Sequence, residues 1–157
     1  MQATAAHLLV VAVTLIAVAS CVLLQYEYLI LLWRRLSVHA GHRRVKVLYA
    51  IFAVIVLHAL EICIFGVALW LLTRWPAVGE LGGEEPSGFF DYLYFSAVTF
   101  TTVGFGEMWP VGAIRFLCAV EALAGFVLIT WSAAFTYLEM EKFWRAEDMK
   151  SGSDPDL

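Results

Sequence analysis

The chain has 157 residues, of which 62% are hydrophobic and only 15% are charged, and this balance is too apolar for an ordinary soluble domain. The formal net charge of -4 at pH 7 is small, so the composition provides no basic surface that would indicate nucleic-acid binding. The sequence contains no nucleophile motif, phosphate loop or cluster of His and Cys ligands, so we expect neither an enzyme nor a bound cofactor.

Three apolar segments are long enough to cross a bilayer, because about 20 residues of helix span a hydrocarbon core of about 30 Å. The first covers residues 5–32, the second covers residues 47–72 and the third covers residues 111–137, within an inner helix predicted for residues 111–144. We therefore expect an all-α integral membrane protein whose outer surface contacts membrane lipid.

The first segment is predicted to be an additional N-terminal transmembrane helix within residues 1–33. Its Val18-Ala19-Ser20-Cys21 stretch loosely resembles a lipoprotein cleavage box, but the basic region that such a signal peptide needs is absent. The segment has no regularly spaced arginines, so it does not resemble a voltage sensor. Its role is not indicated by the sequence.

The charged residues between the segments predict the topology. Residues 34–46 include five basic residues and no acidic one, so this loop is expected in the cytoplasm, where positive charge is retained. Residues 73–88 contain three glutamates against a single arginine and are expected on the extracellular side. The N-terminus is then outside the cell membrane, and the polar residues 146–157 form a disordered cytoplasmic tail.

A shorter apolar piece at residues 89–101 cannot cross the bilayer and is predicted to be a re-entrant helix, which other protein must surround. Ser87 is a plausible N-cap for it, and Asp91 lies in its first turn, where a carboxylate suits the positive end of the helix. The negative end of this helix would then point toward the middle of the membrane, where it favours a cation.

The stretch Thr102-Val103-Gly104-Phe105-Gly106 follows this helix directly. Glycine lacks a Cβ and adopts positive φ, so two glycines at alternate positions allow consecutive carbonyls to face one axis. An ordinary glycine-rich turn is the simpler interpretation of such a string taken alone. In this setting, however, the stretch resembles the potassium-channel signature, and the likeness extends over about residues 90–125, less than a quarter of the chain.

The resemblance implies a potassium-selective channel of the kind with one pore loop per chain, in which residues 47–145 form the pore domain. The filter would be residues 102–106, where the carbonyls of Thr102, Val103, Gly104 and Phe105 bind K+ as the permeant ion. One pore loop forms one wall of such a filter, so the resemblance also implies a homotetramer that conducts potassium passively.

Several residues are implied to support the filter, and some depart from the family pattern. Phe105 replaces the commoner tyrosine, Glu107 replaces an aspartate, and Val98 stands where some members have a buried glutamate. Thr101 and Asp91 complete the candidate support residues. We expect ion selectivity to survive these departures, whereas the stability of the filter during prolonged opening would change.

The third segment should line the inner cavity, and Gly125 lies where the family often has a hinge glycine. A glycine there either permits bending or allows close packing against a neighbouring helix. By helical phase with Gly125, the candidates for the cavity wall are Phe126, Ile129 and Ala133.

Three ionisable residues fall within the predicted spans: His58, Glu61 and Glu121. Charged groups at this depth are costly, so Glu121 should contact either the back of the filter or the pair of His58 and Glu61. The group is interpreted either as a proton sensor or as a hydrogen-bonded brace.

Two other functions remain compatible with the sequence. The modified filter also fits a weakly selective cation channel, which bi-ionic reversal potentials would distinguish from a potassium-selective one. A non-conducting membrane scaffold or accessory subunit could keep the filter sequence as a remnant, and potassium flux from purified protein in liposomes would exclude it.

Overall fold

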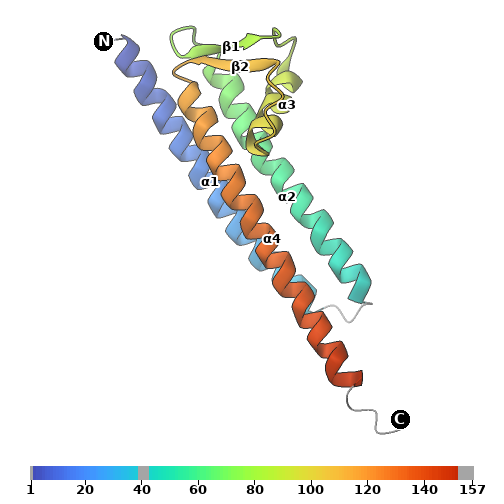
Figure 1. Ribbon diagram of the computed structural model, residues 1–157. Coiled ribbons are helices and arrows are strands. Elements are labelled where there is room, and N and C mark those ends of the chain that lie inside the picture. Colours follow the sequence, from blue (N-terminus) through green and yellow to red (C-terminus); the bar gives the residue numbers. More distant parts are fainter. Residues whose placement is uncertain (1, 39–42, 152–157) are drawn as a thin grey trace.

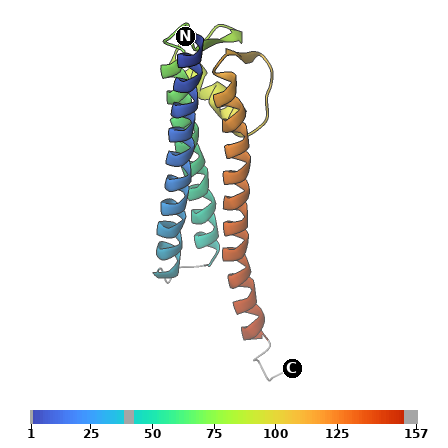
Figure 2. The same ribbon diagram turned by 90° about the vertical axis from the view of Figure 1, so that its left-hand side faces the viewer.

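The structure is a computed structural model that describes residues 2–38 and 43–151, and it describes side-chain surroundings for residues 4–36 and 45–142. Three long helices run alongside one another, while a short helix and a two-stranded ribbon gather at one end of the bundle (Figures 1 and 2). In chain order, the elements are α1 (Gln2–Val38), α2 (Arg43–Leu72), β1 (Gly79–Gly83), α3 (Phe89–Phe100), β2 (Met108–Gly112) and α4 (Arg115–Ser151).

Three helices are long and apolar enough to cross a membrane, over Thr4–Leu36, Val45–Leu72 and Arg115–Lys142. The prediction of three spanning segments is therefore confirmed at the level of length and composition. The prediction of an all-α chain needs a correction, because the mostly helical protein also contains β1 and β2.

The helices extend further than the sequence predicted. Both α1 and α2 continue into the predicted basic loop at residues 34–46, of which residues 39–42 lie outside the described residues. Lys46 Nζ on α2 donates a 3.0 Å hydrogen bond to the Leu36 carbonyl, which lies in the last turn of α1. This bond occupies a carbonyl that the end of the helix leaves without an intrahelical partner.

The last helix also differs from its predicted bounds. It begins at Arg115 rather than at residue 111, because Val111 and Gly112 belong to β2. It continues to Ser151, whereas a disordered tail was predicted from residue 146, and residues 152–157 lie outside the described residues. Residues 146–150 are Ala, Glu, Asp, Met and Lys, most of which favour a helix over an irregular tail.

The two strands form an antiparallel ribbon in which Gly79 pairs with Gly112 and Gly83 pairs with Met108. A Cβ at Gly79 would lie only 2.0 Å from the Val111 carbonyl oxygen, so the close approach of the strands requires glycine there. Glycine-rich sequences have low strand propensity, which is why residues 73–88 were predicted to be a loop throughout. The ribbon joins the segments before and after α3.

Small residues allow α3 to lie deep between α2 and α4. A Cβ at Gly66 of α2 would lie 2.6 Å from Leu93 Cδ2, and a Cβ at Gly125 of α4 would lie 2.0 Å from the Phe100 carbonyl oxygen. Close backbone approach of this kind is how membrane helices pack without a hydrophobic driving force between them. The contacts at both glycines fix the position of α3 in the bundle.

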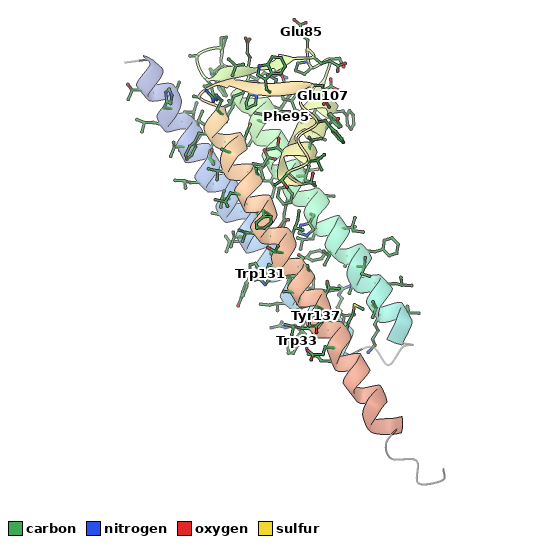
Figure 3. The ribbon with its side chains drawn as sticks, viewed as in Figure 1. Trp33, Glu85, Phe95, Glu107, Trp131 and Tyr137 are labelled. Carbon is green, nitrogen blue, oxygen red and sulfur yellow. The ribbon has the colours of Figure 1, made fainter. Side chains whose placement is uncertain are left out.

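Two groups of buried apolar side chains hold the helices together. The larger group surrounds α3 and includes Phe65, Phe95, Phe100 and Leu117. The smaller group lies between α1 and α2, nearer the other end, and consists of Leu29, Leu32, Leu36, Ala50, Ala53 and Leu57. In Figure 3, Phe95 and Glu107 accordingly lie at the end with the ribbon, and Trp33 and Tyr137 lie toward the opposite end.

Candidate functional site

The predicted filter segment, residues 102–106, begins where α3 ends. The Thr102 amide donates to the Thr99 carbonyl at 3.0 Å, and the amides of Val103 and Gly104 both donate to the Val98 carbonyl, at 3.1 and 3.3 Å. Three consecutive amide groups therefore turn back onto the last turn of α3. Val98 supports this segment through its main-chain oxygen.

Every second residue of the segment has positive φ. The φ angles are 60° at Thr102, 57° at Gly104 and 92° at Gly106, while Val103 and Phe105 have negative φ. Successive carbonyls alternate in direction along an ordinary strand, and a left-handed residue at every second position removes this alternation. Thr102 is the only non-glycine residue with positive φ in the described chain, and a branched side chain makes this conformation costly.

One side of the predicted filter segment faces open space. All residues from Thr101 to Gly106 are exposed, and the exposed fractions of Val103 and Phe105 reach 55% and 69%. An added Cβ at Gly104 would meet no atom within 4 Å. A single chain therefore supports this segment from the α3 side and leaves the other side uncovered.

A cavity of about 460 Å³ lies beside the segment. It is lined by Val98 of α3, by Thr102 and Gly104 of the segment, and by Cys118 and Ala122 of α4. The space between the predicted filter and the start of α4 is therefore not filled by side chains of the same chain.

Glu107 follows the predicted filter segment and is anchored to α3. The Tyr94 hydroxyl donates a 2.5 Å hydrogen bond to Glu107 Oε1. This bond stabilises the ionised carboxylate, so it lowers the pKa of Glu107 and raises the pKa of Tyr94. Sequence reasoning identified Glu107 but missed Tyr94, whose only signal was an unassigned phenol on the predicted re-entrant helix.

Asp91 organises the start of α3 rather than contacting the predicted filter segment. Its Oδ2 accepts hydrogen bonds from the Ser87 amide at 2.6 Å, the Ser87 hydroxyl at 2.8 Å and the Gly88 amide at 3.0 Å. These donors lower the pKa of Asp91. The N-cap is Gly88 and not Ser87, and Asp91 at position N3 accepts a hydrogen bond from the Gly88 amide, as the acidic residue of a capping box does. At the other end, the C-cap Thr101 donates its hydroxyl to the Ala97 carbonyl at 2.7 Å.

The candidate cavity residues on α4 differ in their surroundings. Gly125 is buried against the Phe100 carbonyl, as close packing requires, and α4 continues through it as one helix. Phe126 and Ala133 are exposed, whereas Ile129 is half-buried and packs against the core around α3. The geometry thus favours the packing interpretation of Gly125 in this conformation.

Buried polar side chains connect all four helices, and we call this set the polar ladder. At its upper level, Ser96 of α3 contacts both the Ile62 carbonyl of α2, at 2.9 Å, and Glu121 Oε1 of α4. Glu121 thus reaches α3, and the described residues include no hydrogen bond from it to His58 or Glu61. The partner Ser96 was not predicted.

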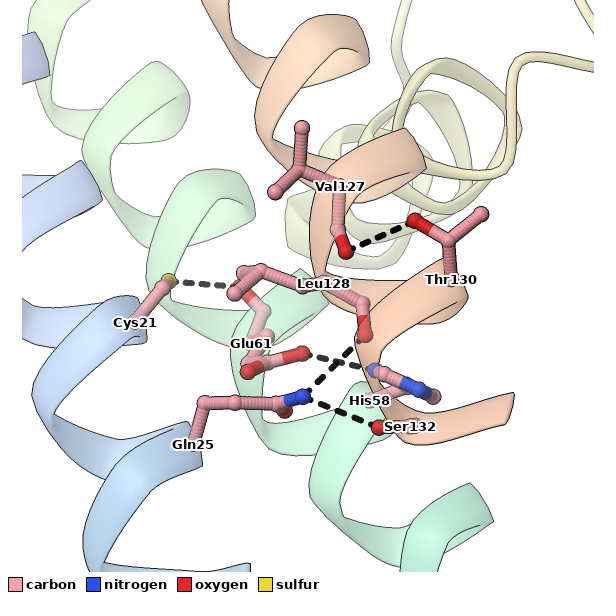
Figure 4. Close-up of polar contacts among 8 residues, drawn as sticks. All are labelled: Cys21, Gln25, His58, Glu61, Val127, Leu128, Thr130 and Ser132. Carbon is pink, nitrogen blue, oxygen red and sulfur yellow. Dashed lines mark hydrogen bonds and ion pairs between the residues drawn. The ribbon is translucent and has the colours of Figure 1, made fainter. Parts of the chain in front are cut away.

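The lower level of the polar ladder joins α1 to α4. Gln25 Nε2 donates to the Leu128 carbonyl at 3.1 Å and to the Ser132 hydroxyl at 2.9 Å (Figure 4). On α2, His58 Nδ1 lies 2.7 Å from Glu61 Oε2, so these two residues form the predicted pair. The members of the polar ladder are Gln25, His58, Glu61, Ser96, Glu121 and Ser132.

Four buried atoms of the polar ladder have no hydrogen-bond partner among the described residues. They are Gln25 Oε1, His58 Nε2, Glu61 Oε1 and Glu121 Oε2. In the same described part of the chain, no group of three or more His, Cys, Asp and Glu side chains is placed to hold a metal ion.

Comparison with known proteins assigns the family. Residues 45–142, more than half of the chain, match the ion channel family. The chain belongs to the ion channel family. The match covers nearly all of α2, together with α3, both strands and most of α4, and it excludes α1. Residues 45–142 therefore form an ion channel domain.

Two curated relatives resemble part of this channel. Protein LctB of Geobacillus stearothermophilus is 36% identical over 53 residues, which are 34% of this chain and 40% of LctB. Two-pore potassium channel 1 of Arabidopsis thaliana is 41% identical over 51 residues, which are 32% of this chain and 14% of that protein. The channel therefore spans less than half the length of each relative. No solved structure matches it.

Proposed function

We propose that this channel is a homotetramer that conducts potassium selectively and passively through main-chain carbonyls of the filter. The observation that carries the proposal is the alternation of φ across Thr102, Gly104 and Gly106, combined with amides that bind back to α3. Such a backbone presents its carbonyls on one side, where they can replace the water shell of a cation.

The carbonyls of Thr102, Val103, Gly104 and Phe105 are the proposed potassium ligands, and the Thr102 hydroxyl closes the innermost site. Carbonyl oxygens are neutral, so they bind a dehydrated monovalent cation without holding it too tightly to leave. The similarity to a protein named as a two-pore potassium channel supports potassium as the ion.

The tetramer follows from the incomplete filter of a single chain. One segment surrounds an ion from one side only, and that side is exposed in the chain. Closed rotational symmetry supplies the missing walls with identical copies. Four copies around one axis also bring neighbouring chains to the uncovered Val103 and Phe105 side chains.

We assign α3 as the re-entrant pore helix. Its 12 residues rise about 18 Å, which is less than the hydrocarbon core of about 30 Å. Its C-terminal end, where the macrodipole is negative, adjoins the start of the filter and favours a cation below it. Asp91 lies at the opposite, positive end, where a carboxylate is stabilising.

The proposed location is the cell membrane, with the ribbon and residues 73–88 outside. The five basic residues between Arg34 and Lys46 support a cytoplasmic link between α1 and α2. The start of α1 then faces outward, and the end of α4 faces the cytoplasm.

Ion flux from purified protein in liposomes tests this function. With a potassium gradient, we expect a flux that clearly exceeds the sodium flux under a matched gradient, because the carbonyl oxygens replace the water shell of K+. Light scattering on the same preparation should give the mass of four chains. Equal potassium and sodium fluxes would instead indicate the weakly selective cation channel, and an intact tetramer without flux would indicate the non-conducting scaffold.

A further inference from the structure

At the upper level of the polar ladder, an ionised Glu121 would leave too few hydrogen-bond donors for the contacts that Ser96 makes. Ser96 Oγ lies within hydrogen-bond distance of two oxygens, the Ile62 carbonyl and Glu121 Oε1. A hydroxyl has one hydrogen to donate, a carbonyl has none, and an ionised carboxylate has none. If Glu121 were ionised, one donor would have to serve two acceptors.

A proton on Glu121 completes this set of contacts. The carboxylic acid then donates to Ser96 Oγ, and the Ser96 hydroxyl donates to the Ile62 carbonyl. Glu121 Oε1, Ser96 Oγ and the Ile62 carbonyl oxygen are then all paired, and the donors run in one direction from α4 through α3 to α2. The three helices around the filter are joined by two hydrogen bonds of normal polarity.

The surroundings of Glu121 disfavour a negative charge. The side chain is fully buried, and its second oxygen, Oε2, has no partner among the described residues. An ionised carboxylate within a membrane is costly unless a cation or several donors surround it. Within the described part of the chain, no lysine or arginine is paired with Glu121.

The titratable neighbours do not supply the missing positive charge. On α1, Cys21 lies within electrostatic reach of both Glu61 and Glu121, and on α4 Cys118 lies within reach of Glu121. On α2, the His58 ring is already engaged with Glu61. The α3 group in contact with Glu121 is Ser96, which does not titrate. Each neighbour is therefore neutral, acidic or already paired.

We propose that Glu121 binds a proton in the assembled channel and, as a neutral acid, is a positioning residue that holds the inner helix against the pore helix. The contact with Ser96 lies one helical turn from Gly125, which packs on the Phe100 carbonyl just before the filter. The bound proton thus helps to set the depth of α3 relative to α4. Only its consequence for ion current rests on the proposed function.

Loss of the proton should weaken the assembly. A glutamic acid in the unfolded chain has already released its proton above about pH 4.3, whereas the folded channel still retains it at neutral pH, so rising pH lowers the stability of the folded state. The loss continues until the proton leaves the folded channel too. Ser96 then faces a carboxylate, and its single hydroxyl hydrogen cannot satisfy both the Ile62 carbonyl and Glu121 Oε1.

Infrared spectroscopy of the tetramer in lipid tests the proposal directly. We expect the carbonyl stretch of a protonated carboxylic acid at neutral pH, shifted in D2O and bleached at alkaline pH. The band should disappear in Glu121→Gln and persist in Glu61→Gln and in Glu139→Gln. Glu139 is a suitable control because its carboxylate pairs with Lys142 in the wild type. A band that persists in Glu121→Gln, or its absence from the wild type at neutral pH, overturns the proposal.

A stability measurement gives a second, independent readout. Glu121→Gln is permanently neutral, and its amide can still donate to Ser96, so the variant should fold. Between neutral and alkaline pH, the melting temperature of the wild type should fall by roughly 3 °C per pH unit more than that of Glu121→Gln. Parallel curves for the two proteins count against the proposal.

Flux in the same liposomes separates this inference from the proposed function. The infrared band does not require conduction, so a channel that shows the band without potassium flux would contradict only the proposed function. If the protein conducts, alkaline inhibition should be present in the wild type and lost in Glu121→Gln. Inhibition that is equal in both proteins overturns the role of the proton in positioning the pore helix.

Discussion

The predicted filter segment and the polar ladder both contain polar groups, but they differ in exposure and in how far apart in the sequence the bonded groups lie. The filter segment is exposed, and its conformation depends on main-chain bonds to residues only a few positions away. The polar ladder is buried, and its side chains come from four helices that are distant in sequence. Local chain geometry therefore suffices to shape the predicted filter segment, whereas the polar ladder exists only after the helices have assembled.

The two regions differ most clearly in the surroundings of their oxygen atoms. The residues of the predicted filter segment are exposed, and in the proposed function their carbonyl oxygens bind an ion. Unpaired oxygens in the ladder, such as Glu121 Oε2, are surrounded by protein and must be satisfied by protons or water. Substitutions should separate the two regions by the property that they disturb.

Gly104→Ala should have the largest effect on conduction. The φ of 57° at Gly104 is unfavourable for alanine, so the carbonyl row would be disrupted although no atom lies within 4 Å of the added Cβ. We expect potassium flux in liposomes to fall by roughly 10-fold or more, because a left-handed alanine costs about 1–2 kcal/mol, while the oligomeric state stays unchanged. The matched control is Gly88→Ala, because Gly88 is equally open but has an extended backbone at φ -171°. Similar losses in both variants would contradict a filter shaped by local backbone geometry.

Gly125→Ala should cause the largest loss of stability among substitutions in the buried region. The new Cβ would lie 2.0 Å from the Phe100 carbonyl oxygen, so α3 and α4 must separate. We expect a loss of about 1–3 kcal/mol in the free energy of unfolding, measured as a lower melting temperature of the protein in detergent.

Gly66→Ala is the graded comparison for this prediction. Its Cβ would meet Leu93 Cδ2 at 2.6 Å, the flexible end of a side chain that can move more easily than a main-chain carbonyl. The loss of stability should therefore be smaller than for Gly125→Ala. An equal or larger loss at Gly66 would show that the α3 and α4 contact is not the tighter constraint.

Gln25→Leu should have an intermediate effect on stability, because it removes the hydrogen bonds that join α1 to the rest of the polar ladder. The variant loses the bonds from Nε2 to the Leu128 carbonyl and the Ser132 hydroxyl, and buried polar contacts in membranes contribute about 0.6 kcal/mol on average. We expect a melting temperature lower by a few degrees, with ion selectivity unchanged. Ser20→Ala is the control, because the Ser20 hydroxyl is bonded only within its own helix, to the Ile16 carbonyl. Altered selectivity in Gln25→Leu would contradict the separation of the two regions.

Tyr94→Phe should have the smallest effect, and its effect should depend on pH. The Tyr94 hydroxyl lowers the pKa of Glu107 from its ordinary value of 4.5, so this bond stabilises the fold above that pH and is lost as pH falls through the lowered pKa. Wild type and Tyr94→Phe should therefore differ slightly in melting temperature at neutral pH and converge at strongly acidic pH. A gap that widens on acidification would contradict this assignment.

The sequence predicted those features that depend on local properties. Apolar runs indicated the three spanning helices, and the spacing of Gly104 and Gly106 indicated residues with positive φ. The polar ladder was only partly predicted, because a single sequence shows that Glu121 needs a partner but not that Ser96 on another helix provides it. The ribbon was missed, since its strands are stabilised by pairing across the chain and not by strand propensity.

The pairing of the two strands brings together the two ends of the segment that contains α3 and the predicted filter segment. Residues 79–83 and 108–112 hydrogen-bond to each other, so the chain that forms α3 and the predicted filter segment leaves and returns at the same place. The distance between the two ends of this unit is set by main-chain pairing and is largely insensitive to the side chains within it. The corresponding stretch of another family member could therefore be transplanted between the two strands, with the long helices serving as an unchanged frame.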